Sequence, residues 1–248
     1  NLNLMKSKQS LSYLSYSIIK NLDLEFSENP PQMVMVQGDT TSALSAALCA
    51  FYRKIPIAHV EAGLRTETLS EPFPEEANRR IISQISNLHF APTNRALKNL
   101  INNGIKSNVH VTGNSVIDAL ILASKKISDI KFDELDHQNK KFILTTIHRR
   151  ENWGQKLIGI ANGLKKILDK FPETMLILPM HPNKIVREPL LRILGNNKQA
   201  LLLEPLTYNK LVYAIKKCYF VVTDSGGLQE EAPTFGKPVL VIRDSTER

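Results

Sequence analysis

Short apolar runs rich in β-branched residues alternate with longer amphipathic segments along most of this chain. In the longer segments apolar residues recur at helical spacing, as Leu11, Leu14, Ile18 and Leu22 do near the start. The pattern predicts strands over residues 33–37, 55–60, 89–91, 109–111, 142–147, 175–178, 200–203, 220–223 and 238–242. It predicts helices over residues 8–27, 41–53, 74–86, 94–103, 115–127, 153–170, 184–194, 207–217 and 227–235. Strands that alternate with helices indicate parallel βαβ units.

A polar stretch over residues 128–141 interrupts this alternation, which then resumes. We interpret the stretch as a linker between two doubly wound α/β lobes, residues 1–130 and residues 140–248. Ligands of such sheets bind outside the carboxyl ends of the strands, so we expect a ligand in the cleft between the lobes. The apolar run over residues 33–37 also predicts a strand that is buried on both faces.

Composition narrows the classes of function. No apolar run approaches the roughly 20 residues that a membrane span requires. The two cysteines, Cys49 and Cys218, lie far apart in apolar segments, which is typical of a reducing compartment. The net charge is +8, but no basic run exceeds two residues and aromatic residues make up 6% of the chain, which favours a small anionic ligand over nucleic acid. Neither a zinc-site spacing nor a dinucleotide fingerprint is present.

Polar side chains stand where the predicted strands end. The candidates are Asp39, Glu61, Glu75, His148, His181 and Asp224. Some have a purely structural interpretation: Asp39 suits a helix cap, and Glu75 suits the start of a helix. His148 is also compatible with an ordinary polar residue at a strand end. Glu61 is harder to explain in this way, because it ends an apolar strand, where a carboxylate costs desolvation.

The sharpest local signal is the sequence Thr-Asp-Ser-Gly-Gly-Leu-Gln-Glu-Glu over residues 223–231. Ser225, Gly226 and Gly227 lie between a predicted strand and a predicted helix, where backbone N–H groups can bind a phosphate. Glu231 lies about one turn into that helix, and its carboxylate can accept two hydrogen bonds from a ribose diol. An ordinary turn before a capped helix explains the same residues, and the sequence leaves both interpretations open.

Seven segments taken together resemble the non-hydrolysing UDP-N-acetylglucosamine 2-epimerases, in order and over nearly the whole chain. They are Gln37–Thr41 (QGDTT), His59–Thr66 (HVEAGLRT), Pro72–Arg79 (PFPEEANR), Val111–Asn114 (VTGN), Thr146–Asn152 (TIHRREN), Thr223–Pro233 (TDSGGLQEEAP) and Gly236–Arg248. The resemblance implies a GT-B fold of two Rossmann-like lobes. It also implies reversible conversion of UDP-N-acetylglucosamine to UDP-N-acetylmannosamine without a metal or redox cofactor. The family members are cytoplasmic homodimers, and their product feeds surface-polysaccharide synthesis.

The resemblance further implies roles for individual residues. Asp39, Glu61 and Glu75 match the acid/base carboxylates, and His148 matches a histidine beside the sugar and phosphates. Other matching positions are Ser225, Gly226 and Gly227 for the diphosphate, Glu231 for the ribose, Arg248 for the ligand, Leu206 and Leu211 near the uracil, and Arg149 and His181 at a possible regulatory site.

The chain departs from the family's pattern at its start, where relatives carry a Gly-Thr-Arg-Pro-Glu-type loop. It begins at Asn1, and Arg248 falls within a motif. We therefore expect a fragment that lacks both ends and is inactive alone. Three other functions stay open: a hydrolysing 2-epimerase that releases free N-acetylmannosamine, a GT-B glycosyltransferase, and a UDP-sugar-binding remnant without catalysis.

Overall fold

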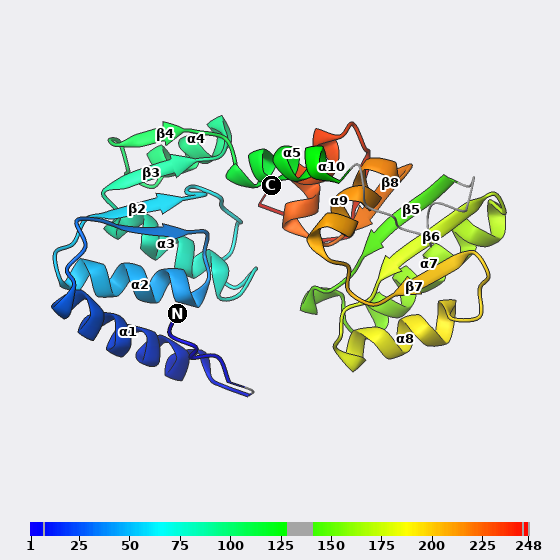
Figure 1. Cartoon of the computed structure of the whole chain (residues 1–248), viewed down its shortest axis with the longest axis horizontal. Coiled ribbons are helices and arrows are strands. Elements are labelled where there is room, and N and C mark those ends of the chain that lie inside the picture. The colour runs from blue at the N-terminus through cyan, green and yellow to red at the C-terminus, as the bar shows by residue number, and fades with distance from the viewer. Residues whose placement is uncertain (7, 128–140, 245, 248) are drawn as a thin grey trace. The chain divides into compact units, whose positions relative to one another are not determined.

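The computed structural model describes residues 1–6, 8–127, 141–244 and 246–247. Its contacts divide the chain into two compact units, residues 1–114 and residues 115–246. Each unit is a parallel sheet with helices packed against it, coloured from blue to green in the first unit and from green to red in the second (Figure 1). The predicted parallel βαβ architecture is therefore confirmed.

The first unit contains a four-stranded parallel sheet in the order β1-β2-β3-β4. Its strands are β1 (Val34–Gln37), β2 (Ile57–Val60), β3 (Leu88–Ala91) and β4 (Val109–Val111). Its helices are α1 (Leu11–Glu28), α2 (Thr41–Tyr52), α3 (Glu75–Ile85) and α4 (Asn94–Asn102). Because strand order follows chain order and every pair is parallel, the carboxyl ends of β1 and β2 meet at one edge of the sheet.

The prediction that residues 33–37 are buried on both faces is wrong. Val36 is buried in a cluster with Ala47, Ile57 and Ile82, where α2 and α3 cover the sheet. Met35 points to the opposite face, because successive side chains of a strand alternate, and it is 65% exposed. An apolar run alone does not show that both faces of a strand are covered.

The second unit contains a five-stranded parallel sheet in the order β7-β6-β5-β8-β9. Its strands are β5 (Lys141–Thr146), β6 (Thr174–Pro179), β7 (Ala200–Leu203), β8 (Phe220–Thr223) and β9 (Val239–Val241). Its helical elements are α5 (Ser115–Lys126), the 3₁₀ turn η1 (Arg150–Asn152), α7 (Gln155–Lys170), α8 (Lys184–Leu194), α9 (Tyr208–Lys217) and α10 (Gly226–Thr234).

Strand β5 is buried on both faces. Ile143 packs in a cluster with residues of α7 and α8, whereas Leu144 packs in a second cluster with residues of α9 and α10. A run of apolar residues without alternation fits this position, because both sides of the strand face helices. The residues that follow the central strands of this sheet are therefore held by a rigid part of the fold.

The division between the units falls before α5 rather than in the polar stretch that we interpreted as a linker. Leu120 and Ile127 lie in a buried cluster with Val212 of α9, which explains why α5 groups with the second unit. The predicted first lobe ran to residue 130. Most of the predicted linker, residues 128–140, lies outside the described residues.

Gly63 gives a test of packing in the first unit. It has a φ of +90°, and a Cβ there would lie 2.3 Å from the backbone oxygen of Ala96. We expect Gly63→Ala to lower the free energy of unfolding by roughly 2–4 kcal/mol, because left-handed strain and overpacking add. Urea denaturation of the purified variant measures this loss.

Gly104 provides the matched control, because its φ is +87° and a Cβ there meets no atom within 4 Å. Gly104→Ala carries the backbone strain without the steric contact. We expect it to cost roughly 1 kcal/mol. Equal losses in the two variants would show that the contact with Ala96 is unimportant.

Candidate functional site

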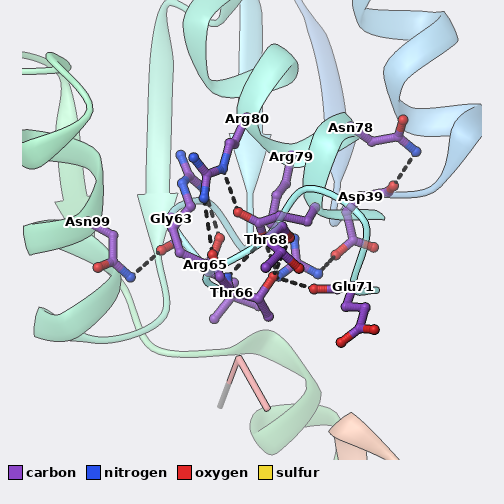
Figure 2. Close-up of polar contacts among 12 residues, drawn as sticks. Asp39, Gly63, Arg65, Thr66, Thr68, Glu71, Asn78, Arg79, Arg80 and Asn99 are labelled. Carbon is purple, nitrogen blue, oxygen red and sulfur yellow. Dashed lines mark hydrogen bonds and ion pairs between the residues drawn. The ribbon is translucent and has the colours of Figure 1, made fainter. Parts of the chain in front are cut away.

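The turn after β1 holds the Asp39 side chain toward α3. The N-cap of α2 is Thr40, whose hydroxyl accepts a hydrogen bond from the backbone N–H of Ala43, so the interpretation of Asp39 as the helix cap is wrong. The Asp39 carboxylate instead accepts a hydrogen bond from the Arg79 guanidinium, and its backbone oxygen accepts one from Asn78 Nδ2 at 2.8 Å (Figure 2). Asp39 is thus fixed by two residues of α3.

A buried carboxylate, Glu76, organises the charges around Asp39. Its Oε1 accepts from Arg80 Nε at 2.6 Å, and its Oε2 accepts from the backbone N–H of Thr66 at 3.0 Å. The Arg79 guanidinium lies 3.3 Å from Glu76 Oε2 and also pairs with Asp39. The side chains of Glu76 and Arg79 are 0% and 4% exposed. We name Asp39, Glu76, Arg79 and Arg80 the ionic network.

Glu61, directly after β2, adopts a left-handed backbone conformation with a φ of +65°. Such a conformation costs a non-glycine residue free energy and persists where the surroundings impose it. The Glu61 carboxylate lies beside the Asp39 turn, since a Cβ at Gly38 would be 3.3 Å from its Oε2. Asn114 Nδ2 lies 3.4 Å from Oε1. The carboxylates of Asp39 and Glu61 therefore stand at adjacent strand ends.

His59 supports this turn from within β2. Its Nε2 donates to the Gly38 carbonyl at 2.8 Å, whereas its Nδ1 is buried without a hydrogen-bond partner. Burial lowers the pKa of His59 to about 4, against the opposing effect of the hydrogen bond to Gly38. The ring is therefore a neutral donor at neutral pH.

Two adjacent carboxylates at the start of α3 differ in environment. Glu75 is half-buried, whereas Glu76 is fully buried in the ionic network. Both lie in the first turn, where the helix dipole favours negative charge. Glu75 is thus the more accessible of the two carboxylates.

In the second unit, a buried carboxylate joins the ends of two neighbouring strands. Asp224 follows β8, is 0% exposed, and accepts hydrogen bonds from the backbone N–H groups of His148 and Arg149 after β5. Asn152 Nδ2 also donates to it at 3.0 Å, and His148 Nδ1 lies 2.9 Å from its Oδ1. Burial by itself raises the pKa of Asp224, but these hydrogen bonds outweigh it and hold the pKa below the usual value.

The predicted phosphate turn is the start of α10. Ser225 is the N-cap, and its backbone N–H donates to Thr223 Oγ1 at 2.9 Å. Glu231 is 7% exposed, and a Cβ at Gly227 would lie 3.6 Å from its Oε2. Burial, followed by the nearby charge of Glu230, raises the pKa of Glu231. The turn and the carboxylate therefore lie together on one helix.

The remaining candidates have the following surroundings. Leu206 and Leu211 are half-buried and pack against the cluster that lies between the sheet and α9 and α10. His181 follows β6, and its Nδ1 accepts from the backbone N–H of Asn183 at 3.1 Å. Arg149 has a buried Nε without a hydrogen-bond partner. Arg248 lies outside the described residues.

Within the ranges that the structure describes, no group of three or more His, Cys, Asp and Glu side chains is arranged to hold a metal ion. None of the helices in the same ranges combines the length and the apolar composition that a membrane span needs.

The site residues that sequence reasoning missed are Glu76 and Arg79. Both stand inside the segment Pro72–Arg79 that we had selected. Asp224 was among the candidates, because it follows a strand directly. No pattern distinguished Glu76 from Glu75, because the difference between them is burial in the folded chain.

The chain is similar to known proteins over its whole length. The family model described as UDP-N-acetylglucosamine 2-epimerase matches residues 1–248. The UDP-N-acetylglucosamine 2-epimerase of Campylobacter jejuni is 44% identical over 259 residues, which cover 100% of this chain and 68% of that protein.

Solved structures of two relatives illustrate the similarity of the fold. The crystal structure of the Neisseria meningitidis UDP-GlcNAc 2-epimerase bound to UDP-GlcNAc matches with a TM-score of 0.95 and 44% identity, over 100% of this chain and 69% of that one. The Methanocaldococcus jannaschii UDP-GlcNAc 2-epimerase in complex with UDP-GlcNAc and UDP matches with a TM-score of 0.88 and 32% identity, again over 100% and 69%. The chain thus spans about two thirds of the length of these relatives, and its α/β fold is of the GT-B type, as in these structures. The chain belongs to the UDP-N-acetylglucosamine 2-epimerase family.

Proposed function

We propose that the whole protein to which this chain belongs interconverts UDP-N-acetylglucosamine and UDP-N-acetylmannosamine by inversion at C2. The observation that carries the proposal is the match of the family over all 248 residues, together with a 44% identical relative whose structure holds UDP-GlcNAc. Asp39 and Glu61, two of the three carboxylates expected from the resemblance, stand at adjacent strand ends of the first unit, which supports the same activity.

Inversion at C2 requires removal of a hydrogen from carbon, which is far less acidic than a carboxylic acid with a pKa of about 4. Coupling this removal to departure of UDP from C1 makes the step feasible. The proton passes to a carboxylate, the C1–O bond breaks with its electron pair leaving on UDP, and a C1–C2 double bond forms. Addition of UDP to this 2-acetamidoglucal, with a proton delivered to the opposite face of C2, gives the epimer.

Such a scheme needs proton-transfer groups on both faces of the sugar. We assign these roles to Asp39, Glu61 and Glu75, which three separate segments of the first unit supply. The ionic network supports this assignment, because it fixes Asp39 against α3 while Glu75 stays accessible.

The second unit is proposed to bind the leaving diphosphate and the ribose. The turn formed by Ser225, Gly226 and Gly227 suits a phosphate, because the backbone N–H groups at the start of α10 carry a partial positive charge. Such donors stabilise the charge that develops on UDP as the C1–O bond breaks. Glu231 suits the ribose diol, and His148 suits the sugar or the phosphates. Three further roles stay predictions. They are Leu206 and Leu211 near the uracil, Arg248 at the ligand, and Arg149 and His181 at a regulatory site.

Turnover of UDP-N-acetylglucosamine in heavy water tests the proposal on the whole protein. We expect a product that is still attached to UDP, is inverted at C2, and carries one deuterium at C2, as read by mass spectrometry and proton NMR. The solvent deuterium follows from the elimination, since the proton removed from C2 exchanges with the medium.

Other products would point to the other functions. Free N-acetylmannosamine and UDP would indicate a hydrolysing epimerase, and transfer to an acceptor without deuterium at C2 would indicate a glycosyltransferase. Binding of UDP without any turnover would contradict the proposal.

We place the proposed enzyme in a reducing cytoplasm and propose that the whole protein forms a homodimer. Cys49 and Cys218 are both free and buried, which suits a compartment where cysteine acts as a small apolar residue. The homodimer comes from the resemblance, and sedimentation of the whole protein would test it.

A further inference from the structure

The contact between His148 and Asp224 determines which nitrogen of the imidazole carries the proton. His148 Nδ1 lies 2.9 Å from Asp224 Oδ1. An ionised carboxylate can only accept hydrogen bonds, so the proton of this bond belongs to Nδ1. His148 Nε2 makes no hydrogen bond to the part of the chain that the structure describes, and 40% of the His148 side chain is exposed. The free nitrogen is therefore the one available to a ligand.

Several hydrogen bonds hold the Asp224 carboxylate in place. The carboxylate is 0% exposed and is held by the N–H groups of His148 and Arg149, which follow β5. Asn152 Nδ2 donates to it and also to the backbone oxygen of Ile242, both at 3.0 Å. The strands that carry these residues are themselves paired, with Thr146 opposite Thr223 in the register of β5 and β8. Asp224 thus has little freedom to leave the His148 ring.

We propose that Asp224 is a positioning residue that fixes the neutral His148 ring as the Nδ1–H tautomer, so that Nε2 presents a lone pair to the nucleotide sugar. This inference rests on the proposed function, because it assumes that His148 lies beside the ligand. Protonation then changes His148 at Nε2 alone, from a hydrogen-bond acceptor to a donor. A histidine held by a buried carboxylate acts in one tautomer only, as metal-bound histidines do when a second group orients them.

The tautomer can be read directly with ¹⁵N-labelled histidine in the whole protein, at about pH 8.5, where an ordinary imidazole is neutral. Assignment of the His148 signal uses the His148→Ala variant, in which that signal disappears. We expect the nitrogen-15 shifts of the wild type to show a protonated Nδ1 and a bare Nε2. In Asp224→Asn the amide NH₂ can donate to Nδ1, so we expect the proton to move to Nε2. A wild-type ring protonated at Nε2 would overturn the proposal, even if the variant does not fold.

Turnover separates positioning from a purely structural effect. We expect Asp224→Asn to lower kcat by about 100-fold or more in the presence of His148. In the His148→Ala background the same change should alter kcat by no more than about twofold, since Asp224 then has no ring to orient. Asp169→Asn, an exposed change on α7, is the matched control and should leave kcat unchanged. An equal loss in both backgrounds would show that Asp224 is only structural.

The failure of this inference differs from the failure of the proposed function. If the wild-type protein does not epimerise UDP-N-acetylglucosamine, the proposed function fails, but the tautomer measurement still decides whether Asp224 orients His148. If the enzyme is active and the tautomer does not move in Asp224→Asn, the positioning role is refuted and the proposed function stands.

Discussion

Glu76→Gln is expected to lower the free energy of unfolding of the first unit by about 3–5 kcal/mol, which is the cost of breaking a buried ion pair by removal of one partner. Glu76 is 0% exposed and contacts Arg79 and Arg80. Arg65 stands near the same carboxylate: burial lowers its pKa to about 10, and the charge of Glu76 opposes that effect. In the variant Arg79 keeps Asp39 as an ionic partner, but Arg80 loses the charge of Glu76. The single oxygen of the glutamine amide can accept from Arg80 or from the backbone N–H of Thr66, but not from both.

The measurement is urea denaturation of the whole protein, followed by circular dichroism and by hydrogen exchange of the β1 and β2 amides. A loss of this size is a large share of the 5–15 kcal/mol by which a typical domain is stable, so low yield of the variant is part of the expected result.

Glu75→Gln is the matched control, since it makes the same chemical change one residue earlier in the same helix. Glu75 is half-buried and lies outside the ionic network, so we expect a change in stability within about 0.5 kcal/mol. Its proposed role in proton transfer predicts a loss in kcat of about 100-fold or more. Equal destabilisation by both changes would refute the special role of Glu76, and normal turnover in Glu75→Gln would remove that residue from the proposed acid/base set.

This pair of residues shows how far the sequence predicts the site. The position of the carboxylates followed from strand ends and from the resemblance, and Asp39 and Glu61 do lie at adjacent strand ends. The sequence did not indicate which neighbour becomes buried, because Glu75 and Glu76 are equal in type and both suit the first turn of a helix. The Asp39 turn raised the same difficulty, since a cap by Asp39 or by Thr40 is a matter of side-chain geometry.

The fold was more predictable, because hydrophobic periodicity fixes the type of each element. The bounds of β4, α8, β7 and β8 agree with the prediction. The helix predicted over residues 153–170 begins later, at Gln155, because Gly154 has a φ of +75° and a 3₁₀ turn precedes it. The exposure of Met35 could not be predicted, since it depends on which helices cover the sheet and not on the run of apolar residues in β1.

Acid is expected to destabilise the first unit through His59. The ring is 0% exposed, and burial lowers its pKa to about 4, whereas an unfolded histidine has a pKa of about 6.5. Between these two values the unfolded chain binds a proton that the folded chain does not, so stability is complete above about pH 6.5 and falls as the pH decreases toward 4. The pKa difference corresponds to a loss of roughly 3 kcal/mol. His89 is also buried with a lowered pKa, so it adds to the loss in the same range.

His59→Gln isolates this contribution, because the glutamine amide nitrogen can replace Nε2 as the donor to the Gly38 carbonyl and does not titrate. Unfolding by urea between about pH 7.5 and pH 4 should show a loss in the variant that is smaller than in the wild type by roughly 3 kcal/mol. The exposed His110, on β4 of the same sheet, is the control, and His110→Gln should leave the pH dependence of the wild type unchanged. The two histidines differ because Nδ1 of His59 is buried. Protonation of this nitrogen places a charge among atoms that offer it no hydrogen-bond acceptor. If His59→Gln loses stability with acid as steeply as the wild type does, the acid sensitivity of this unit lies elsewhere.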